Sequence, residues 1–187
     1  MTLSVVIPSS QKDYRNALRQ QVFCLSRGAA EAKVITEGRS IAEARNIGIA
    51  RTYGDEILIL DADMILPANI DLSSLSSYNY DLATAWYETV EPLDNLVIMY
   101  QNFMTAIGSP LGVFGGFMYF KRKVFRDVGP FREMPGEDIE WATRAWLRGW
   151  KVKHFDFVVR HGREFHWANA IGPIVNEKGE IWGLPMT

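Results

Sequence analysis

The stretch Ile57-Leu58-Ile59-Leu60-Asp61-Ala62-Asp63 decides the fold, because a short apolar run ends abruptly in two acids. The run is apolar at every position, which is typical of a central parallel strand whose two faces are both covered. Open α/β sheets bind their ligands beyond the carboxyl ends of the strands. Asp61 and Asp63 therefore mark the place where a site is expected.

The residues before this strand alternate between strand and helix patterns. Residues 3–7 form a β-branched run that Pro8 stops, and residues 33–36 form a second short strand. A helix is expected over residues 10–25, where apolar side chains recur at helical spacing: Tyr14, Leu18, Val22 and Leu25. Ser40-Ile41-Ala42-Glu43 is typical of a capping box that opens a second helix. The alternation predicts a parallel sheet with right-handed crossovers.

The later part of the chain is less regular. Strands are expected over residues 81–87, 117–120 and 155–159, helices over 93–107 and 137–148, a loop over 109–116 and a hairpin turn over 176–179. The basic cluster of Lys121, Arg122, Lys123 and Arg126 is interpreted as a solvated strand end and turn. No repeat or linker interrupts the sequence, so residues 1–187 are expected to form one domain.

Composition narrows the possible functions. The 187 residues are 48% hydrophobic, enough for one substantial core, and the formal net charge of −2 disfavours nucleic acid as a partner. Cys24 is the sole cysteine, which excludes an internal disulfide and a thiolate metal cluster. No apolar run approaches the roughly 20 residues of a transmembrane helix, and the start lacks a secretory signal. A cytoplasmic protein is the simplest expectation, with peripheral membrane attachment left open.

The acids after the central strand suit a metal site. In an extended chain, side chains two residues apart project to the same side, so Asp61 and Asp63 are expected to face one ion. Two hard oxygen donors suit Mg²⁺ or Mn²⁺, which bridges a diphosphate in such sites. Two aspartates that merely cap a loop are an equally good interpretation of the pattern alone.

Three further features admit both a functional and a structural interpretation. Glu137-Asp138 opens a helix, so one acid is either a general base or a favourable partner of the helix dipole. Gly115-Gly116 allows close backbone approach to a ligand, or simply a tight turn. His161 or His166 can complete a metal shell, whereas His154 on the late strand is expected to be structural.

In order and spacing, these segments resemble the family 2 glycosyltransferases of the GT-A fold. The resemblance spans about four fifths of the chain, through Ser4 to Pro8, Ala44 to Gly48, Asp61 to Asp63, Gly115-Gly116, Phe125 to Phe131 and Glu137 to Gly149. It implies an α/β, Rossmann-like domain with a mostly parallel central sheet flanked by helices. It also implies a nucleotide-sugar-binding part over residues 1–64 and an acceptor-binding and catalytic part over 65–187.

The resemblance implies transfer of a sugar from a UDP- or GDP-sugar to an acceptor hydroxyl, with Mn²⁺ or Mg²⁺ as cofactor. The positions that match nucleotide-sugar contacts are Pro8, Ser9, Glu37, Arg45, Asp61, Ala62, Asp63, Gly115 and Gly116. Asp61 and Asp63 match the metal ligands, and His161 resembles a late histidine near the metal. Asp138 matches the catalytic base of inverting members, with Glu137 beside it.

Two departures from the family pattern leave alternatives open. Thr36-Glu37-Gly38-Arg39 stands where the family often has two aspartates and a Gly-Ser, so the base of the nucleotide is not specified. The chain is also short for the family, which leaves the glycan, lipid or protein acceptor, a retaining outcome and a homo-oligomer open. The competing functions are an aspartyl-phosphate phosphotransferase, a sugar nucleotidyltransferase and a non-catalytic nucleotide-sugar- or carbohydrate-binding module.

Overall fold

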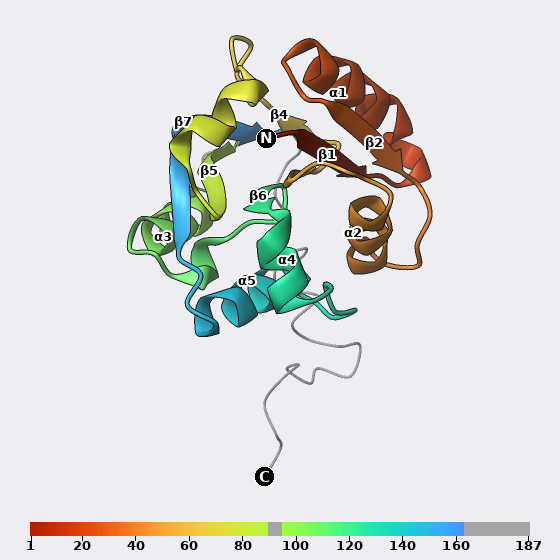
Figure 1. Ribbon diagram of the computed structural model, residues 1–187. Helices are drawn as coiled ribbons and strands as arrows, with labels where there is room; N and C mark the ends of the chain where they lie inside the picture. Colours follow the sequence, from red (N-terminus) through yellow and green to blue (C-terminus); the bar gives the residue numbers. More distant parts are fainter. Residues whose placement is uncertain (90–94, 163–187) are drawn as a thin grey trace, which may run out of the picture.

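A computed structural model describes residues 1–89 and 95–162 of the chain. Its strands form one curled sheet in the order β2-β1-β3-β6-β5-β7-β4 (Figure 1). Their bounds are β1 Leu3–Pro8, β2 Glu31–Ile35, β3 Glu56–Leu60, β4 Met64–Ile65, β5 Leu82–Thr89, β6 Phe117–Lys121 and β7 Val152–His161. The helices are α1 Tyr14–Ser26, α2 Ile41–Ala50, α3 Asn95–Ala106, α4 Arg122–Val128 and α5 Glu137–Leu147. Short 3-10 turns cover η1 Gln11–Asp13, η2 Leu72–Tyr78 and η4 Pro110–Gly112.

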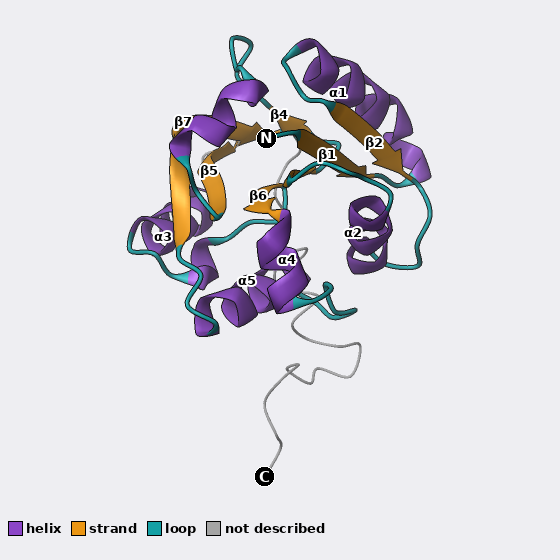
Figure 2. Cartoon of the chain, viewed as in Figure 1, coloured by secondary structure: helices purple, strands orange, loops and turns teal. Residues whose placement is uncertain are grey.

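Both faces of the sheet are covered, as the apolar β3 predicts. Alternate residues of β1 belong to different cores: Val5 and Ile7 pack with α1 and η2, and Val6 packs with α2, α4 and α5. Figure 2 shows the helices distributed around the strands in this way. All residues of β3 are buried. The α/β class is therefore confirmed, with helices flanking one central sheet.

Strand direction changes across the sheet. β3 runs parallel to β1, which runs parallel to β2, so the first three strands form the predicted crossover unit. On its other side β3 pairs antiparallel with β6, and β6 pairs antiparallel with β5. β5 then runs parallel to β7, and β4 adds to β7 in the antiparallel sense. This second half is the part whose pattern was least regular in the sequence.

The predicted capping box at the start of α2 is present in a modified form. The Ser40 hydroxyl accepts a hydrogen bond from the backbone N–H of Glu43, at 3.1 Å. The Glu43 carboxylate reaches back to the backbone N–H of Arg39, at 2.7 Å, rather than to that of Ser40. Two N–H groups at the helix start are satisfied in either case, and α2 is fixed beside the ends of β1 and β2.

Two sequence predictions of burial were wrong. The stripe of Tyr14, Leu18, Val22 and Leu25 on α1 is exposed, and the helix buries Ala17 and Cys24 instead. Small side chains let α1 approach the sheet closely, so the inward face is set by size and not by hydrophobicity alone. On α5, the sequence spacing places Ala142, Ala145 and Trp146 on one side of the helix. The two alanines are buried, but Trp146 is exposed and Trp141 lies in the core.

The interpretation of the basic cluster as a solvated strand end and turn is correct only in part. Lys121 ends β6, and Lys123 and Arg126 are exposed, but the residues after the strand form α4 and not a turn. Arg122 donates hydrogen bonds to the carbonyl oxygens of Gly54, Ile49 and Thr52, at 2.6, 3.0 and 2.9 Å. These carbonyls lie at and after the end of α2, where helical partners are missing. The sequence could not reveal this role because the acceptors lie about seventy positions away. The hairpin turn expected over residues 176–179 lies outside the described residues.

Within the described ranges, no helix combines the length and the apolar character that crossing a bilayer requires.

Candidate active site

A cleft lies where the carboxyl ends of β1, β2 and β3 meet. Its volume is about 380 Å³, and the lining residues come from the segments that follow these three strands and from the start of α2: Pro8, Ser9, Ser10, Asp13, Thr36, Glu37, Gly38, Arg39, Ser40, Ile41, Ala44, Asp61, Ala62 and Asp63. The location agrees with the expectation for ligand sites in open α/β sheets. Six of the predicted site residues therefore share one cleft: Pro8, Ser9, Glu37, Asp61, Ala62 and Asp63.

The two acids after β3 sit in a turn, not in the extended chain that the sequence argument assumed. The backbone N–H of Met64 donates to the carbonyl oxygen of Asp61 at 3.1 Å, which closes the turn. The Asp61 N–H donates to the Gly116 carbonyl, and the Gly162 N–H donates to the Asp63 carbonyl. These bonds tie the turn to β6 and β7, and both carboxylates still line the cleft.

Asp61 lies between the cleft and a buried arginine. Nη2 of Arg45 is 3.6 Å from Oδ1 of Asp61, and the Asp61 side chain keeps 27% of its surface exposed. Burial raises the pKa of Asp61 to about 6, and the charge of Arg45 opposes that rise. Oδ1 of Asp61 accepts no hydrogen bond within the described part of the chain, although it is screened from solvent. The nearest cation to Oδ1 is the Arg45 guanidinium, so the Asp61 carboxylate connects the cleft to the buried arginine.

Arg45 joins the cleft to the start of α5. Only 2% of this residue is exposed, and its Nη1 donates a hydrogen bond to Oε1 of Glu137. Its guanidinium also lies over the ring of Phe131, 5.7 Å from the centroid. Burial raises the pKa of Glu137, while Arg45 acts in the opposite direction. Arg45 does not line the cleft, so this geometry favours a role in positioning Asp61 and Glu137.

Asp138 is held in place by two backbone donors. Its Oδ2 accepts a hydrogen bond from the N–H of Gly115 at 2.7 Å, and its Oδ1 accepts one from the N–H of Ile139 at 2.8 Å. Each carboxylate oxygen can accept a second hydrogen bond. Asp138 lies outside the cleft lining, and its bond to Gly115 connects it to the loop that precedes β6.

The glycine pair is required by packing. A Cβ on Gly115 would overlap the guanidinium of Arg45, and a Cβ on Gly116 would lie 2.8 Å from Sδ of Met64. The pair lies in a tight turn, as one of the two interpretations had it, and its backbone closely approaches the buried arginine and the methionine. Close approach to a ligand stays a prediction. We refer to Arg45, Gly115, Glu137 and Asp138 together as the inner group.

The end of β7 brings a histidine to the second acid. Nε2 of His161 lies 3.6 Å from Oδ2 of Asp63, and the ring of Phe114 meets its ring edge-on at 6.1 Å. His154 lies farther along β7 and packs against Trp86, with ring centroids 4.2 Å apart, as expected for a structural residue. His166 falls outside the described residues.

The donor set fits a divalent cation that keeps other ligands. Asp61 and Asp63 both line the cleft and offer hard carboxylate oxygens, and this donor chemistry is the observation that supports the fit. In residues 1–89 and 95–162, no three acidic, histidine or cysteine side chains converge closely enough to hold an ion alone. Magnesium and manganese are commonly bound by one or two carboxylates plus phosphate oxygens and water.

Arg39 was not identified as a site residue from the sequence, although its charge suits it to bind a phosphate group. Arg39 follows β2, lines the cleft and has an 83% exposed side chain, although it also contacts Glu43 and Glu133. It is a cation at the carboxyl edge of the sheet, where a diphosphate is expected. The available signal was its place just after β2, in the segment that departs from the family pattern.

Comparisons with known proteins agree with this architecture. The family model described as "Glycosyl transferase family group 2" matches residues 57–172. No curated protein matches the chain by sequence. Among solved structures, a mannosyltransferase from Pyrobaculum calidifontis, in complex with GDP-Man and Mn²⁺, superposes with a TM-score of 0.64 at 17% identity. The match covers 90% of this chain and 59% of that protein, so this chain spans less than two thirds of its length.

A second similar structure is glucosyl-3-phosphoglycerate synthase from Mycobacterium tuberculosis. Its complex with Mn²⁺, UDP and glucosyl-3-phosphoglycerate gives a TM-score of 0.63 at 17% identity, over 91% of this chain and 75% of that one. Its complex with Mg²⁺ and UDP gives a TM-score of 0.60 at 17% identity, over 90% and 73% of the two chains. At such identities the likeness shows a shared fold, which is the GT-A fold expected from the resemblance. From the family match over most of its length, the chain belongs to glycosyl transferase family group 2.

Proposed function

We propose that the chain is a metal-dependent glycosyltransferase that moves a sugar from a UDP- or GDP-sugar to an acceptor hydroxyl, with inversion at the anomeric carbon. The observation that carries the proposal is the cleft at the ends of β1, β2 and β3, where Asp61 and Asp63 face Ser9 and Glu37. Support also comes from the similar structures, which bind GDP-Man or UDP together with Mn²⁺ or Mg²⁺.

Each part of the cleft has a proposed partner in the donor. Asp61 and Asp63 hold the cation, and His161 beside Asp63 adds a nitrogen donor. When bound, Mn²⁺ or Mg²⁺ supplies positive charge that stabilises the departing diphosphate. Pro8, Ser9 and Glu37 lie where the nucleotide is proposed to sit, with Arg39 available to its phosphates.

Asp138 is proposed to act as the general base. It takes the proton of the acceptor hydroxyl while the hydroxyl oxygen bonds to the anomeric carbon. The bond from that carbon to the diphosphate breaks in the same step, and its electron pair leaves with the diphosphate. The backbone N–H groups of Gly115 and Ile139 orient the carboxylate, and Glu137 stays paired with Arg45 beside it.

We also propose that different parts of the chain bind the donor and the acceptor. Residues 1–64 supply most of the cleft lining, and residues 65–187 supply Asp138, Glu137 and His161. We therefore place the donor on the first part and the acceptor on the second.

Donor binding with and without metal tests the proposal directly. We expect UDP- or GDP-sugars to bind in calorimetry with Mn²⁺, and Asp63→Asn to weaken that binding at least about tenfold, because it removes a charged ligand. Asp55→Asn, at an exposed acid before β3, is the matched control and should bind as the wild type does. Equal affinity for the donor in Mn²⁺ and in EDTA would show that the metal does not contribute to donor binding. Tight binding without turnover on any acceptor would instead favour the non-catalytic module.

A further inference from the structure

Among the described side chains of α3, Asn102 is directed to the sheet whereas several large apolar side chains are exposed. Asn102 faces β5, where its Oδ1 accepts a hydrogen bond from the Tyr87 N–H and its Nδ2 donates one to the Tyr87 carbonyl, both at 3.0 Å. The pairing of β5 with β6 ends at Thr84, and beyond it Asn102 supplies the hydrogen bonds to Tyr87 on a strand that β7 continues to pair on its other side. The opposite face of α3 is therefore not needed for packing against the sheet.

The outward face of α3 continues onto α5. Its large apolar side chains are between 49% and 63% exposed, and we call them the α3 patch: Met99, Tyr100, Phe103, Ile107 and Trp146. Met99, Phe103 and Ile107 follow one another at a spacing of four, so they form one stripe along the helix. Ile107 and Trp146 line the same hollow, which joins the two elements. Contiguous exposed apolar surface of this kind marks an interaction site in soluble proteins.

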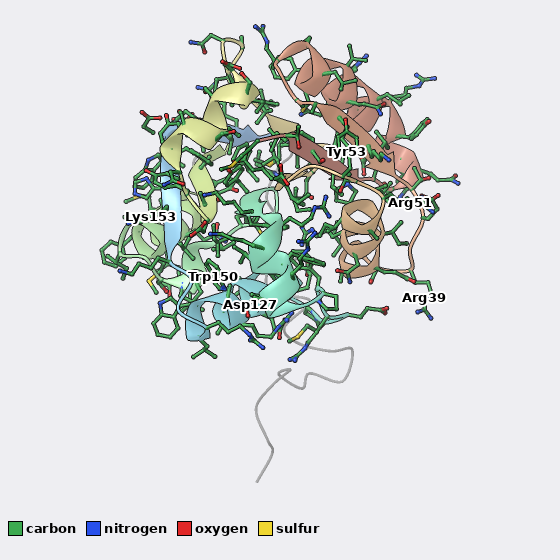
Figure 3. The ribbon with its side chains drawn as sticks, viewed as in Figure 1. Arg39, Arg51, Tyr53, Asp127, Trp150 and Lys153 are labelled. Carbon is green, nitrogen blue, oxygen red and sulfur yellow. The ribbon has the colours of Figure 1, made fainter. Side chains whose placement is uncertain are left out.

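The charged side chains that line the hollow beside the α3 patch are both lysines. From Asn95 to Phe120 the sequence has no charged side chain, so no carboxylate of α3 opposes an anionic partner. Lys151 and Lys153 line the hollow of about 510 Å³ together with Ile107 and Trp146. Neither lysine forms an ion pair with any residue in the described ranges. Figure 3 shows Lys153 on β7, the strand beside α3.

We propose that the α3 patch docks the protein onto an anionic phospholipid bilayer. Apolar and aromatic side chains of an interfacial helix enter the boundary between head groups and acyl chains, and adjacent lysines attract the lipid phosphates. Tyr100 and Trp146 have the amphipathic rings that prefer this boundary. The exposed stripe of α1 differs, because Arg15 and Arg19 interrupt it and it contains one aromatic ring, that of Tyr14. The proposal goes beyond sugar transfer and does not depend on it.

Cosedimentation with lipid vesicles tests the docking in the whole chain. The probes are vesicles of phosphatidylcholine alone, and vesicles in which about one third of the lipid is phosphatidylglycerol. We expect the protein to sediment with the anionic vesicles at low salt, to bind neutral vesicles much more weakly and to dissociate as salt screens the lysines.

Two variants with matched controls locate the binding surface. Phe103→Ser with Ile107→Ser should lower the partition onto anionic vesicles by about tenfold or more. Val22→Ser with Leu25→Ser removes exposed apolar side chains from α1, at the other end of the sheet, and should leave it unchanged (Figure 1). Lys151→Glu with Lys153→Glu should remove the preference for anionic lipid, whereas Lys12→Glu with Arg15→Glu should not. Circular dichroism verifies that each variant is folded.

Three outcomes would overturn the proposal. The first is wild-type protein that stays in the supernatant with anionic vesicles at low salt. The second is an α3 variant that binds vesicles as well as the wild type does. The third is a protein that ignores vesicles but changes from dimer to monomer when Phe103 and Ile107 are replaced, since the patch would then be covered by a second copy. Loss of sugar transfer in any of these variants bears on the proposed function and leaves the docking result intact.

Discussion

The cleft and the inner group both contain carboxylates, yet they use them differently. In the cleft, Asp61 and Asp63 are partly exposed and lie at a turn that ends a strand. In the inner group, Glu137 is paired with the buried Arg45, and Asp138 is bound by two backbone N–H groups. The cleft is suited to exchanging ligands, whereas the inner group is suited to keeping side chains fixed.

Arg45 connects the two arrangements, because it contacts Asp61 on one side and Glu137 on the other. The charge of the cleft is therefore set in part by a residue that does not line it. From this difference we expect substitutions in the inner group to alter the rate of sugar transfer or the stability of the fold, and substitutions in the cleft to alter ligand binding.

The largest expected effect is on the rate of sugar transfer in Asp138→Asn. A general base contributes about 10²- to 10⁴-fold, so the rate constant should fall by that factor while donor affinity stays near the wild-type value. Single-turnover kinetics and calorimetry measure the two quantities. Asp156→Asn, on the exposed side of β7, is the control. A variant that keeps the full rate would move the base elsewhere.

The next largest effect is on stability, in Arg45→Met. The change leaves Asp61 and Glu137 without their buried cation, which should lower the free energy of unfolding by about 3–5 kcal/mol in urea denaturation. Arg51→Met breaks the exposed pair with Glu37 and should cost at most about 1 kcal/mol. Equal losses of unfolding free energy in the two variants would contradict the expected difference between buried and exposed ion pairs.

The pH dependence of stability, compared between the wild type and Asp61→Asn, isolates the contribution of Asp61. Its pKa is raised from 3.8 to about 6. A group whose pKa is raised by folding stabilises the native state below its unfolded pKa, and that contribution is lost as pH rises through the folded value. In EDTA, the wild type should therefore lose about 2–3 kcal/mol between pH 4 and pH 7 relative to Asp61→Asn. Parallel stability curves for the two proteins would contradict the raised pKa.

The smallest effect is expected for Gly115→Ala. The added methyl group meets the guanidinium of Arg45, and overpacking of this kind costs about 1–3 kcal/mol in unfolding free energy. The backbone angle of Gly115 is not left-handed, so the contact alone should cause the loss. In the Arg45→Met background the same change should cost less, which a double-mutant cycle measures. A cost that does not depend on residue 45 would rule out this contact as the cause.

The first three strands, the two intervening helices and the place of the cleft were predictable from the amino-acid sequence. Strand and helix periodicities over residues 3–60 are local, and each strand end is marked by Pro8, Glu37 or Asp61. The capping box at Ser40 is likewise a matter of neighbouring residues. Parallel strands place their carboxyl ends at one edge, so six predicted site residues meet there without further information.

The partners of the acids in the site were not predictable from the sequence, because they depend on contacts between distant positions. Arg45 is far from both Glu137 and Gly115 in the sequence. Helix and strand periodicities do not predict contacts between such distant residues. The same limit explains the wrong assignments of Trp146, of Arg122 and of the inward face of α1. Whether a residue is buried depends on the residues that pack against it from other parts of the chain. The size of those side chains and the positions of their hydrogen-bond acceptors are not visible in the local sequence pattern.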